Sequence, residues 1–157
     1  MTVEIRLVQF FDVLTDNNQR HRFQNYYVGQ SKTFGGVSYS FAPFQVEGAT
    51  SSLNGENEQL TVLFPATDYA IRLVEAGQGN RKSQLTLNTR FIGSTNGEPG
   101  NNGPRGIFVG LGASFSTETV ELRFSSALDS AASQFPATTL TSENAGILPL
   151  ESQLQLR

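Results

Sequence analysis

The chain has 157 residues, about the length of one average domain, and a formal net charge of −3 at pH 7. It contains no cysteine and one histidine, which excludes disulfide bonds, thiolate zinc sites, iron–sulfur clusters, cysteine nucleophiles and histidine-rich metal sites. Only two of its 11 basic residues are lysines, and the basic stripe that tight nucleic-acid binding needs is missing.

Polar and apolar residues alternate along much of the chain, a pattern typical of half-buried antiparallel strands. The alternation predicts strands over residues 3–7, 23–28, 37–41, 59–64, 85–91, 107–115 and 120–125. In the first of these, Glu4 and Arg6 interrupt the apolar residues, so the stretch is neither a signal-peptide core nor a membrane span. The predicted fold class is mainly β: a single antiparallel β-barrel or sandwich of about eight strands, forming one domain over residues 1–157.

One helix is predicted over residues 68–76. Thr67 is a candidate N-cap, Asp68 places a negative charge in the first turn, and Gly77 stands at the C′ position. The apolar residues of this segment form a narrow stripe, which we expect to lie against the sheet. A second, weaker prediction is a short helix over residues 129–134.

The strand predicted at 107–115 carries glycines at alternate positions. Its apolar residues, from Ile107 to Phe115, fall on one face, and the opposite face includes Gly110 and Gly112. Glycines in this arrangement indicate a bend, a bulge or the close approach of another backbone.

The longest loop spans residues 93–106 and has five glycines, two prolines and no apolar side chain. We expect that such a loop cannot pack against its own domain, because a compact domain seldom keeps one this long without a partner, a ligand or disorder. Since it joins two predicted strands, it is interpreted as the tip of a long hairpin arm that forms contacts in an assembly. Deletion of residues 97–103 is expected to leave the monomer folded and to impair assembly. The expected interface residues are Gly97, Pro99, Asn101, Asn102, Pro104 and Arg105.

The C-terminal residues 128–157 contain few strand-like runs. We expect them to wrap over the body of the domain and to add one short strand. The apolar residues expected to anchor this segment are Phe135, Ile147, Leu148 and Leu150.

No motif in the sequence supports catalytic chemistry. His21 lies in a polar stretch predicted to be an exposed turn, and no activated serine is placed beside it. Glu56 and Glu58 resemble a glycosidase pair only in spacing, because they lie in a turn where both carboxylates would be solvated. No phosphate-binding loop or nucleophile elbow is present. We therefore expect a protein that is not an enzyme, with no catalytic residue, no cofactor and no metal.

Two stretches resemble tail proteins of double-stranded DNA phages. The first reads GGVSYSFAPFQV over residues 35–46 and is followed, after a Gly/Ser/Asn spacer, by QLTVLF at 59–64. In those proteins a G-V-x-Y-x-x-x-P-F strand precedes a short turn, a strand and a helix. The second stretch, over residues 128–150, is similar to their closing segment. The chain thus resembles the minor tail protein L and distal-tail or baseplate-hub type over most of its length, without the cysteine-bearing extension that some relatives carry.

This resemblance implies a tail-tube-like β domain that assembles as a homo-oligomer ring, trimeric or hexameric, around a channel. The ring would be a structural part of the tail tip or baseplate and would link the tail tube to a hub or spike. Its partners would be other tail tube, hub or baseplate proteins, with DNA passing only passively and no membrane contact. The protein would reside in the virion tail after assembly in the host cytoplasm. The 51 serine, threonine, asparagine and glutamine residues suit the wet contacts of such an assembly.

The alternative is a carbohydrate- or receptor-binding β-sandwich module of a virion. Tyr26 and Tyr27 are neighbours in a predicted strand, so only one of them could face any one ligand. Loss of glycan binding on replacing Tyr27 or Tyr39 by alanine would favour this reading.

Overall fold

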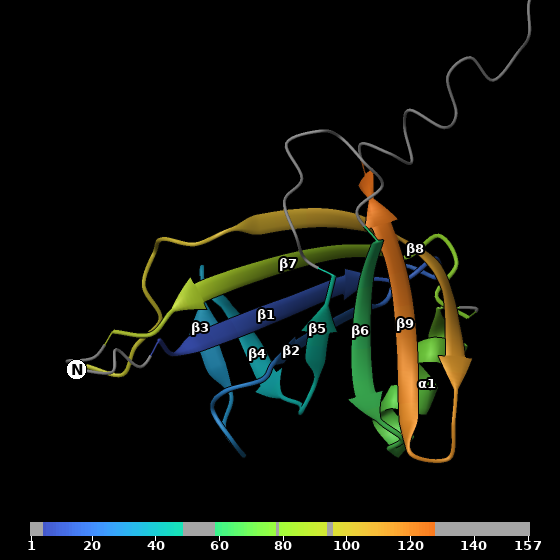
Figure 1. The fold of residues 1–157 in the computed structure, drawn as a ribbon, viewed down its shortest axis with the longest axis horizontal. Coiled ribbons are helices and arrows are strands. Elements are labelled where there is room, and N and C mark those ends of the chain that lie inside the picture. The colour runs from blue at the N-terminus through green and yellow to red at the C-terminus, as the bar shows by residue number, and fades with distance from the viewer. Residues whose placement is uncertain (1–4, 49–58, 78, 94–95, 128–157) are drawn as a thin grey trace, which may run out of the picture.

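The computed structural model describes residues 5–48, 59–77, 79–93 and 96–127 (Figure 1). Within these residues the chain forms nine strands and one helix, α1 (Asp68–Ala76). The strands are β1 (Leu7–Leu14), β2 (Arg20–Gln24), β3 (Lys32–Phe34), β4 (Val37–Phe41), β5 (Gln45–Glu47), β6 (Gln59–Pro65), β7 (Gln84–Phe91), β8 (Arg105–Phe115) and β9 (Thr119–Ser126). The segment 128–157, the helix predicted at 129–134, and Glu56 and Glu58 lie outside the described residues.

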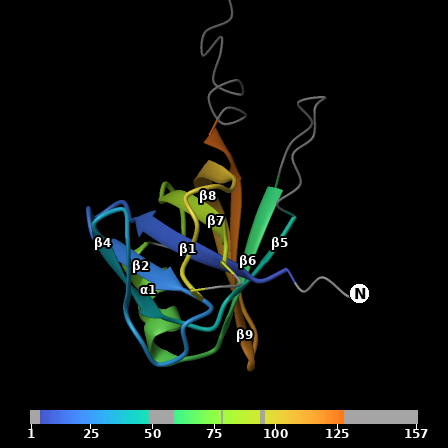
Figure 2. The ribbon, with the colours of Figure 1, turned by 90° about the vertical axis from the view of Figure 1, so that its left-hand side faces the viewer.

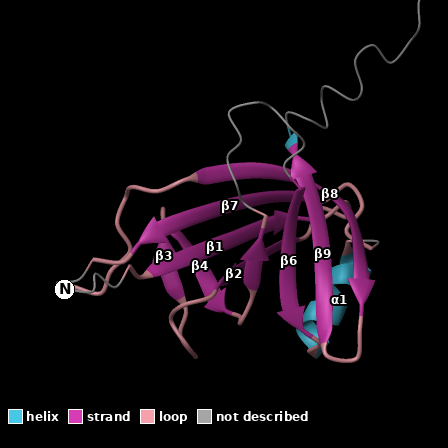
Figure 3. Ribbon diagram, in the orientation of Figure 1, coloured by secondary structure: helices cyan, strands magenta, loops and turns pink. Residues whose placement is uncertain are grey.

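All nine strands belong to one sheet, in the order β3-β4-β2-β1-β7-β8-β9-β6-β5. The sheet is not closed into a barrel and ends at β3 and β5. It curves so that β1, β2 and β4 lie on one side and β5, β6 and β9 on the other, as in a sandwich (Figure 2). Strands make up 55% of the described residues and helix 9%, so the predicted mainly β fold with one short helix is confirmed (Figure 3).

Strand direction differs from the prediction at one position in the sheet. β2 and β4 run parallel, with Phe23 opposite Ser40 and Gln24 opposite Phe41. Between them the chain forms β3, which is antiparallel to β4. Because β3 reverses the chain once before β4, β4 returns in the direction of β2. The period-2 alternation predicts strands but contains no information on their relative direction.

Two predicted strands have other boundaries in the structure. The pattern at 3–7 leads into β1, which starts at Leu7 and continues to Leu14. The pattern at 23–28 is interrupted because β2 ends at Gln24. The buried Gln24 side chain accepts hydrogen bonds from the backbone N–H groups of Tyr26 and Tyr27, at 2.9 and 2.7 Å. It also donates to the carbonyls of Tyr27 and Gln30, so it fixes a turn where the alternation predicts a strand.

The inner face of the sheet and α1 enclose the larger hydrophobic cluster, here called the main core. Its buried members are Phe11, Val13, Ala42, Phe44, Leu60, Val62, Phe64, Ala70, Leu73, Val74, Leu85, Leu87, Phe108, Val120, Leu122 and Phe124. Phe11 has no exposed surface, and its ring centroid lies 5.5 Å from that of Phe64 and 5.7 Å from that of Phe44. Burying a side chain of this size contributes about 1.5–3 kcal/mol, so the main core supplies most of the driving force for folding.

The helix α1 has the predicted boundaries, 68–76. Its residues Ala70, Leu73 and Val74 are buried in the main core, as the apolar stripe predicts. The cap differs in detail, because the Thr67 side chain makes no capping hydrogen bond. Gly77 has a negative φ of −90°, and the left-handed conformation that commonly ends a helix is adopted two residues later by Gly79, with φ of +75°.

The predicted irregularity in 107–115 is confirmed as a β-bulge and a close backbone approach in β8. The pairing with β9 shifts between Gly110 and Gly112, so Leu111 is an extra residue in the strand. Because one inserted residue reverses the facing of those that follow, the apolar residues from Ile107 to Phe115 do not share one face. A Cβ at Gly110 would lie 1.9 Å from the Asn80 carbonyl oxygen, which explains why glycine is needed there.

A smaller hydrophobic cluster lies on the outer face of β1. Val8, Phe10 and Tyr39 are buried in it, and the partly buried residues around them include Tyr26, Tyr27, Phe34, Val37 and Ile92. The Phe10 ring stacks on Phe34, with centroids 4.5 Å apart, and meets Tyr39 edge-on at 4.9 Å. This outer cluster binds the β3–β4 hairpin to the centre of the sheet and borders the polar groups described next.

Candidate functional site

The loop between β7 and β8 is anchored to its own domain by polar contacts. The Tyr27 hydroxyl donates to the Gly97 carbonyl at 2.7 Å, and Lys32 forms an ion pair with Glu98 at 2.7 Å. The hydrogen bond to Glu98 raises the pKa of Lys32. At the other end of the loop, Arg90 donates to the Gly103 carbonyl at 2.6 Å. The expectation that this loop cannot pack against its own domain is therefore wrong for its described residues.

The physical reason is that the anchoring uses hydrogen bonds and charge instead of apolar contact. Gln24 holds the turn that carries Tyr27, and the Lys32 ammonium lies 4.5 Å from the Tyr27 ring centroid. Gly103 is also confined, because a Cβ there would lie 2.0 Å from the Thr89 carbonyl oxygen. Deleting residues 97–103 would remove the contacts that Gly97, Glu98 and Gly103 make with the domain, so that deletion is not a clean test of assembly.

The structure places five of the predicted interface residues in this loop and the sixth, Arg105, in β8. Gly97, Asn101, Asn102 and Pro104 are exposed, whereas Pro99 is half-buried and pairs with Ile92 in an isolated β-bridge. Arg105 is the first residue of β8 and lies opposite Asn88 in the β7–β8 register. The loop thus presents asparagine side chains to solvent while Arg105 belongs to a separate site on the sheet.

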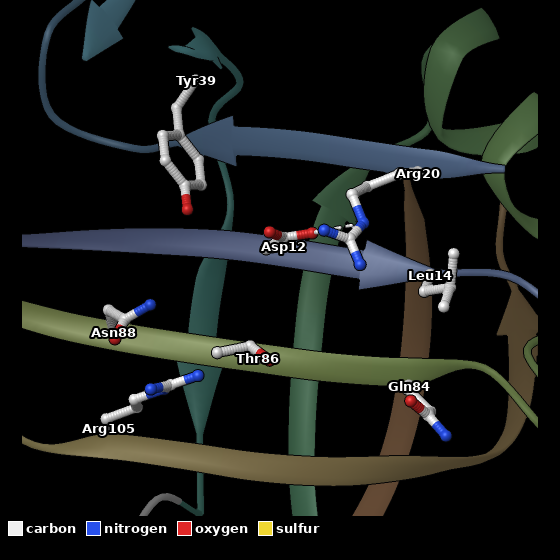
Figure 4. A pocket seen from close by; sticks show the side chains of 8 residues that line it. All are labelled: Asp12, Leu14, Arg20, Tyr39, Gln84, Thr86, Asn88 and Arg105. Atoms are coloured by element: carbon white, nitrogen blue, oxygen red, sulfur yellow. Dashed lines mark ion pairs between the residues drawn. The ribbon is translucent and has the colours of Figure 1, made fainter. Parts of the chain in front are cut away.

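That site is a polar pocket of about 250 Å³ on the outer face, here called the outer pocket (Figure 4). It is lined by Asp12, Leu14, Arg20, Tyr39, Gln84, Thr86, Asn88 and Arg105. Strand register brings these residues together: Asp12 stands opposite Arg22 on one side and opposite Thr86 on the other. Side chains on this face alternate with the main-core residues of β1 and β7, so the same strands serve both faces.

Asp12 is the acidic centre of the outer pocket. Its carboxylate pairs with the Nε atoms of Arg22 at 3.3 Å and Arg20 at 3.7 Å. Burial raises the pKa of the Tyr39 hydroxyl, with the Asp12 charge acting in the same direction. Arg105 forms no ion pair with any described residue and is exposed at the mouth of the pocket. The pocket therefore combines neutral hydrogen-bonding groups with more positive than negative charge.

The other sequence candidates occupy different places from those expected. His21 lies in β2 opposite Val13, half-buried, and burial lowers its pKa. Its ring stacks on Phe23 at 6.5 Å, and its buried Nε2 has no hydrogen-bond partner in the described structure, so the prediction of an exposed turn is wrong. Tyr26 and Tyr27 are in a turn and pack edge-to-face at 5.1 Å, not on opposite faces of a strand.

The outer pocket is the feature that sequence reasoning missed. The alternating polar residues of β7, Gln84, Thr86 and Asn88, are a local signal of a polar outer face. Nothing local shows that Asp12, Tyr39 and Arg105 converge on the same face, because this depends on the pairing of β1 and β8 with β7 and on the position of β4.

The described residues contain no group of three or more histidine, cysteine, aspartate or glutamate side chains that could hold a metal ion. None of their helices is long and apolar enough to cross a membrane.

No protein-family model matches this chain, and no curated protein matches it.

Proposed function

We propose that the protein is a structural subunit of a phage tail tip or baseplate, which assembles into a ring that links the tail tube to a hub or spike. The resemblance of residues 35–64 to phage tail proteins motivates this proposal. Because the chain forms a mainly β domain with one helix, its fold is compatible with a tail-tube-like subunit.

The observation that carries the proposal is apolar surface exposed at two places on opposite faces of the sheet, here called the two patches: the single Ile107 side chain on one face and the Leu7–Phe91 pair on the other. Ile107, opposite Thr86, points outward and is 53% exposed. Leu7 and Phe91 pair across β1 and β7, on the face of the main core but beyond it, and are 45% and 49% exposed. Adjacent apolar side chains that stay exposed together, as Leu7 and Phe91 do, are a feature of interfaces.

Two different patches on one subunit suit a head-to-tail ring, in which each subunit uses one patch for each neighbour. The edges of the sheet are poorer contacts, because β3 and β5 have only three residues each. The loop that joins β7 to β8 lies between Phe91 and Ile107, and its exposed Asn101 and Asn102 would add hydrogen bonds at the rim.

A complementation experiment tests this arrangement. Ile107→Glu and Phe91→Glu each destroy one patch, and light scattering should find each variant monomeric where the unmodified protein forms trimers or hexamers. A mixture of the two variants retains one intact contact, so it should form heterodimers and no ring. Ile71→Glu, the same kind of change at an exposed position of α1, is the control and should assemble normally. Normal assembly of both patch variants would refute the proposal.

A further inference from the structure

The outer pocket has more hydrogen-bonding groups than its own residues use. Within the described chain, the side chains of Gln84 and Thr86 and the hydroxyl of Tyr39 make no hydrogen bond. Asn88 is 93% buried, and its amide oxygen accepts one long hydrogen bond, 3.5 Å from Arg90. Because buried polar groups are usually paired, the unused hydrogen-bonding capacity of the buried Asn88 and Tyr39 points to a polar ligand, which Gln84 and Thr86 could also reach.

The charges around the pocket indicate the sign of that ligand. Two arginines of the lining, Arg20 and Arg105, and the neighbouring Arg22 outnumber the single carboxylate, that of Asp12, and Arg105 lies across the pocket from it (Figure 4). Arg20 and Arg22 share Asp12, and Arg105 has no carboxylate partner among the described residues. An anionic group placed beside Arg105 would gain a charge-assisted hydrogen bond, which is about twice as strong as a neutral one.

We propose that the outer pocket binds one acidic sugar unit, with its anionic group against Arg105 and its hydroxyls against Asn88, Thr86, Gln84 and Tyr39. A sugar ring offers several hydroxyls that both donate and accept, which is what amide and hydroxyl side chains match. The volume of about 250 Å³ lies below the usual range of drug-sized ligand pockets, so it suits one ring and not a longer chain. This site is independent of the proposed ring assembly.

Titration of the ¹⁵N-labelled protein, followed by two-dimensional NMR, tests the ligand class. The probes are glucuronate, glucose 6-phosphate, glucose and inorganic phosphate. We expect one or both of the acidic sugars to bind at least about tenfold more tightly than glucose or phosphate, and their relative affinity distinguishes a carboxylate from a phosphate ligand. The shifted amide signals should belong to β1, β4, β7 and the start of β8.

Variants then test the site itself. Arg105→Gln should weaken binding of the acidic sugar about tenfold, and Tyr39→Phe, which keeps the ring packed on Phe10, should weaken it severalfold at unchanged melting temperature. Arg72→Gln, the same charge change on the exposed face of α1, is the matched control and should bind normally.

Four results would overturn the proposal: no saturable binding of either acidic sugar, equal affinity for glucose, equal affinity for phosphate alone, or unchanged affinity in Arg105→Gln. A monomeric protein that still binds an acidic sugar would refute the ring assembly and leave this site intact.

Discussion

Phe10 and Phe11 are neighbours on β1 and neither has exposed surface, yet they belong to different parts of the molecule. Phe11 lies in the main core among other phenylalanines from across the chain, including Phe44 and Phe64. Phe10 lies in the outer cluster with two buried neighbours, Val8 and Tyr39. Two residues further along β1, the outer face is already polar at Asp12, which lines the outer pocket.

The contrast distinguishes the residues that stabilise the fold from the residues that are available to bind other molecules. The inner face is apolar along β1, β6, β7 and β9, and α1 covers part of it. On the outer face a small apolar cluster only secures the β3–β4 hairpin, and the remaining surface carries the outer pocket and Ile107. We infer that stability depends mainly on the inner face, and that recognition uses the outer face together with the exposed end of the inner face at Leu7 and Phe91.

The largest effect that sharpens this contrast is expected from truncating the two phenylalanines. Phe11→Ala should destabilise the protein by about 4 kcal/mol and Phe10→Ala by about 3 kcal/mol. The difference arises because Phe10 packs in the smaller outer cluster, which can relax around the missing ring more readily than the main core can. Urea unfolding measures both changes in free energy. A larger loss in Phe10→Ala than in Phe11→Ala would contradict the division between the two faces.

A smaller effect is expected where β8 crosses the turn before β7. Gly110→Ala would place a Cβ 1.9 Å from the Asn80 carbonyl oxygen and should cost about 2–3 kcal/mol through overpacking. Gly112→Ala is the matched control two residues away, because its Cβ would meet only the Arg123 guanidinium at 3.7 Å. Its free energy of unfolding should change by less than about 0.5 kcal/mol. Equal losses in the two variants would show that β8 is not held against this turn.

The smallest effect concerns the pH dependence of stability that arises from His21, at the edge of the main core. Burial lowers the pKa of His21 below its ordinary value of 6.5, so the unfolded chain binds its proton more readily than the folded one. The contribution of His21 to the free energy of unfolding is complete above pH 6.5 and declines as the pH falls through the lowered pKa. Between pH 7.5 and pH 5.5, the melting temperature should therefore fall further in the natural protein than in His21→Phe. Parallel profiles of the two proteins would contradict the buried position of this ring.

The sequence predicts those parts of the fold that depend on local patterns. The boundaries of α1 are predicted correctly from its flanking residues and apolar stripe, although Thr67 makes no capping hydrogen bond, and the irregularity of β8 is predicted from its alternate glycines. The end of β2 could not be predicted, because it depends on one buried side chain, that of Gln24, whose hydrogen bonds replace the strand pairing.

The candidate sites depend on contacts between distant residues and were correspondingly harder to predict. Tyr27 and Gly97 are 70 residues apart, and their hydrogen bond anchors a loop that composition alone describes as unattached. The outer pocket joins Asp12 to Arg105 through the register of three strands, which no single-sequence pattern encodes. The alternating polar residues of β7 are the one part of the outer pocket that a local sequence pattern indicates.

Electron microscopy of the purified full-length protein in negative stain tests the central claim, that this domain is built to assemble, most directly. We predict closed rings of three or six subunits around a central channel, lost in Ile107→Glu and retained in Ile71→Glu. Single, unassociated subunits at every protein concentration examined would contradict the account.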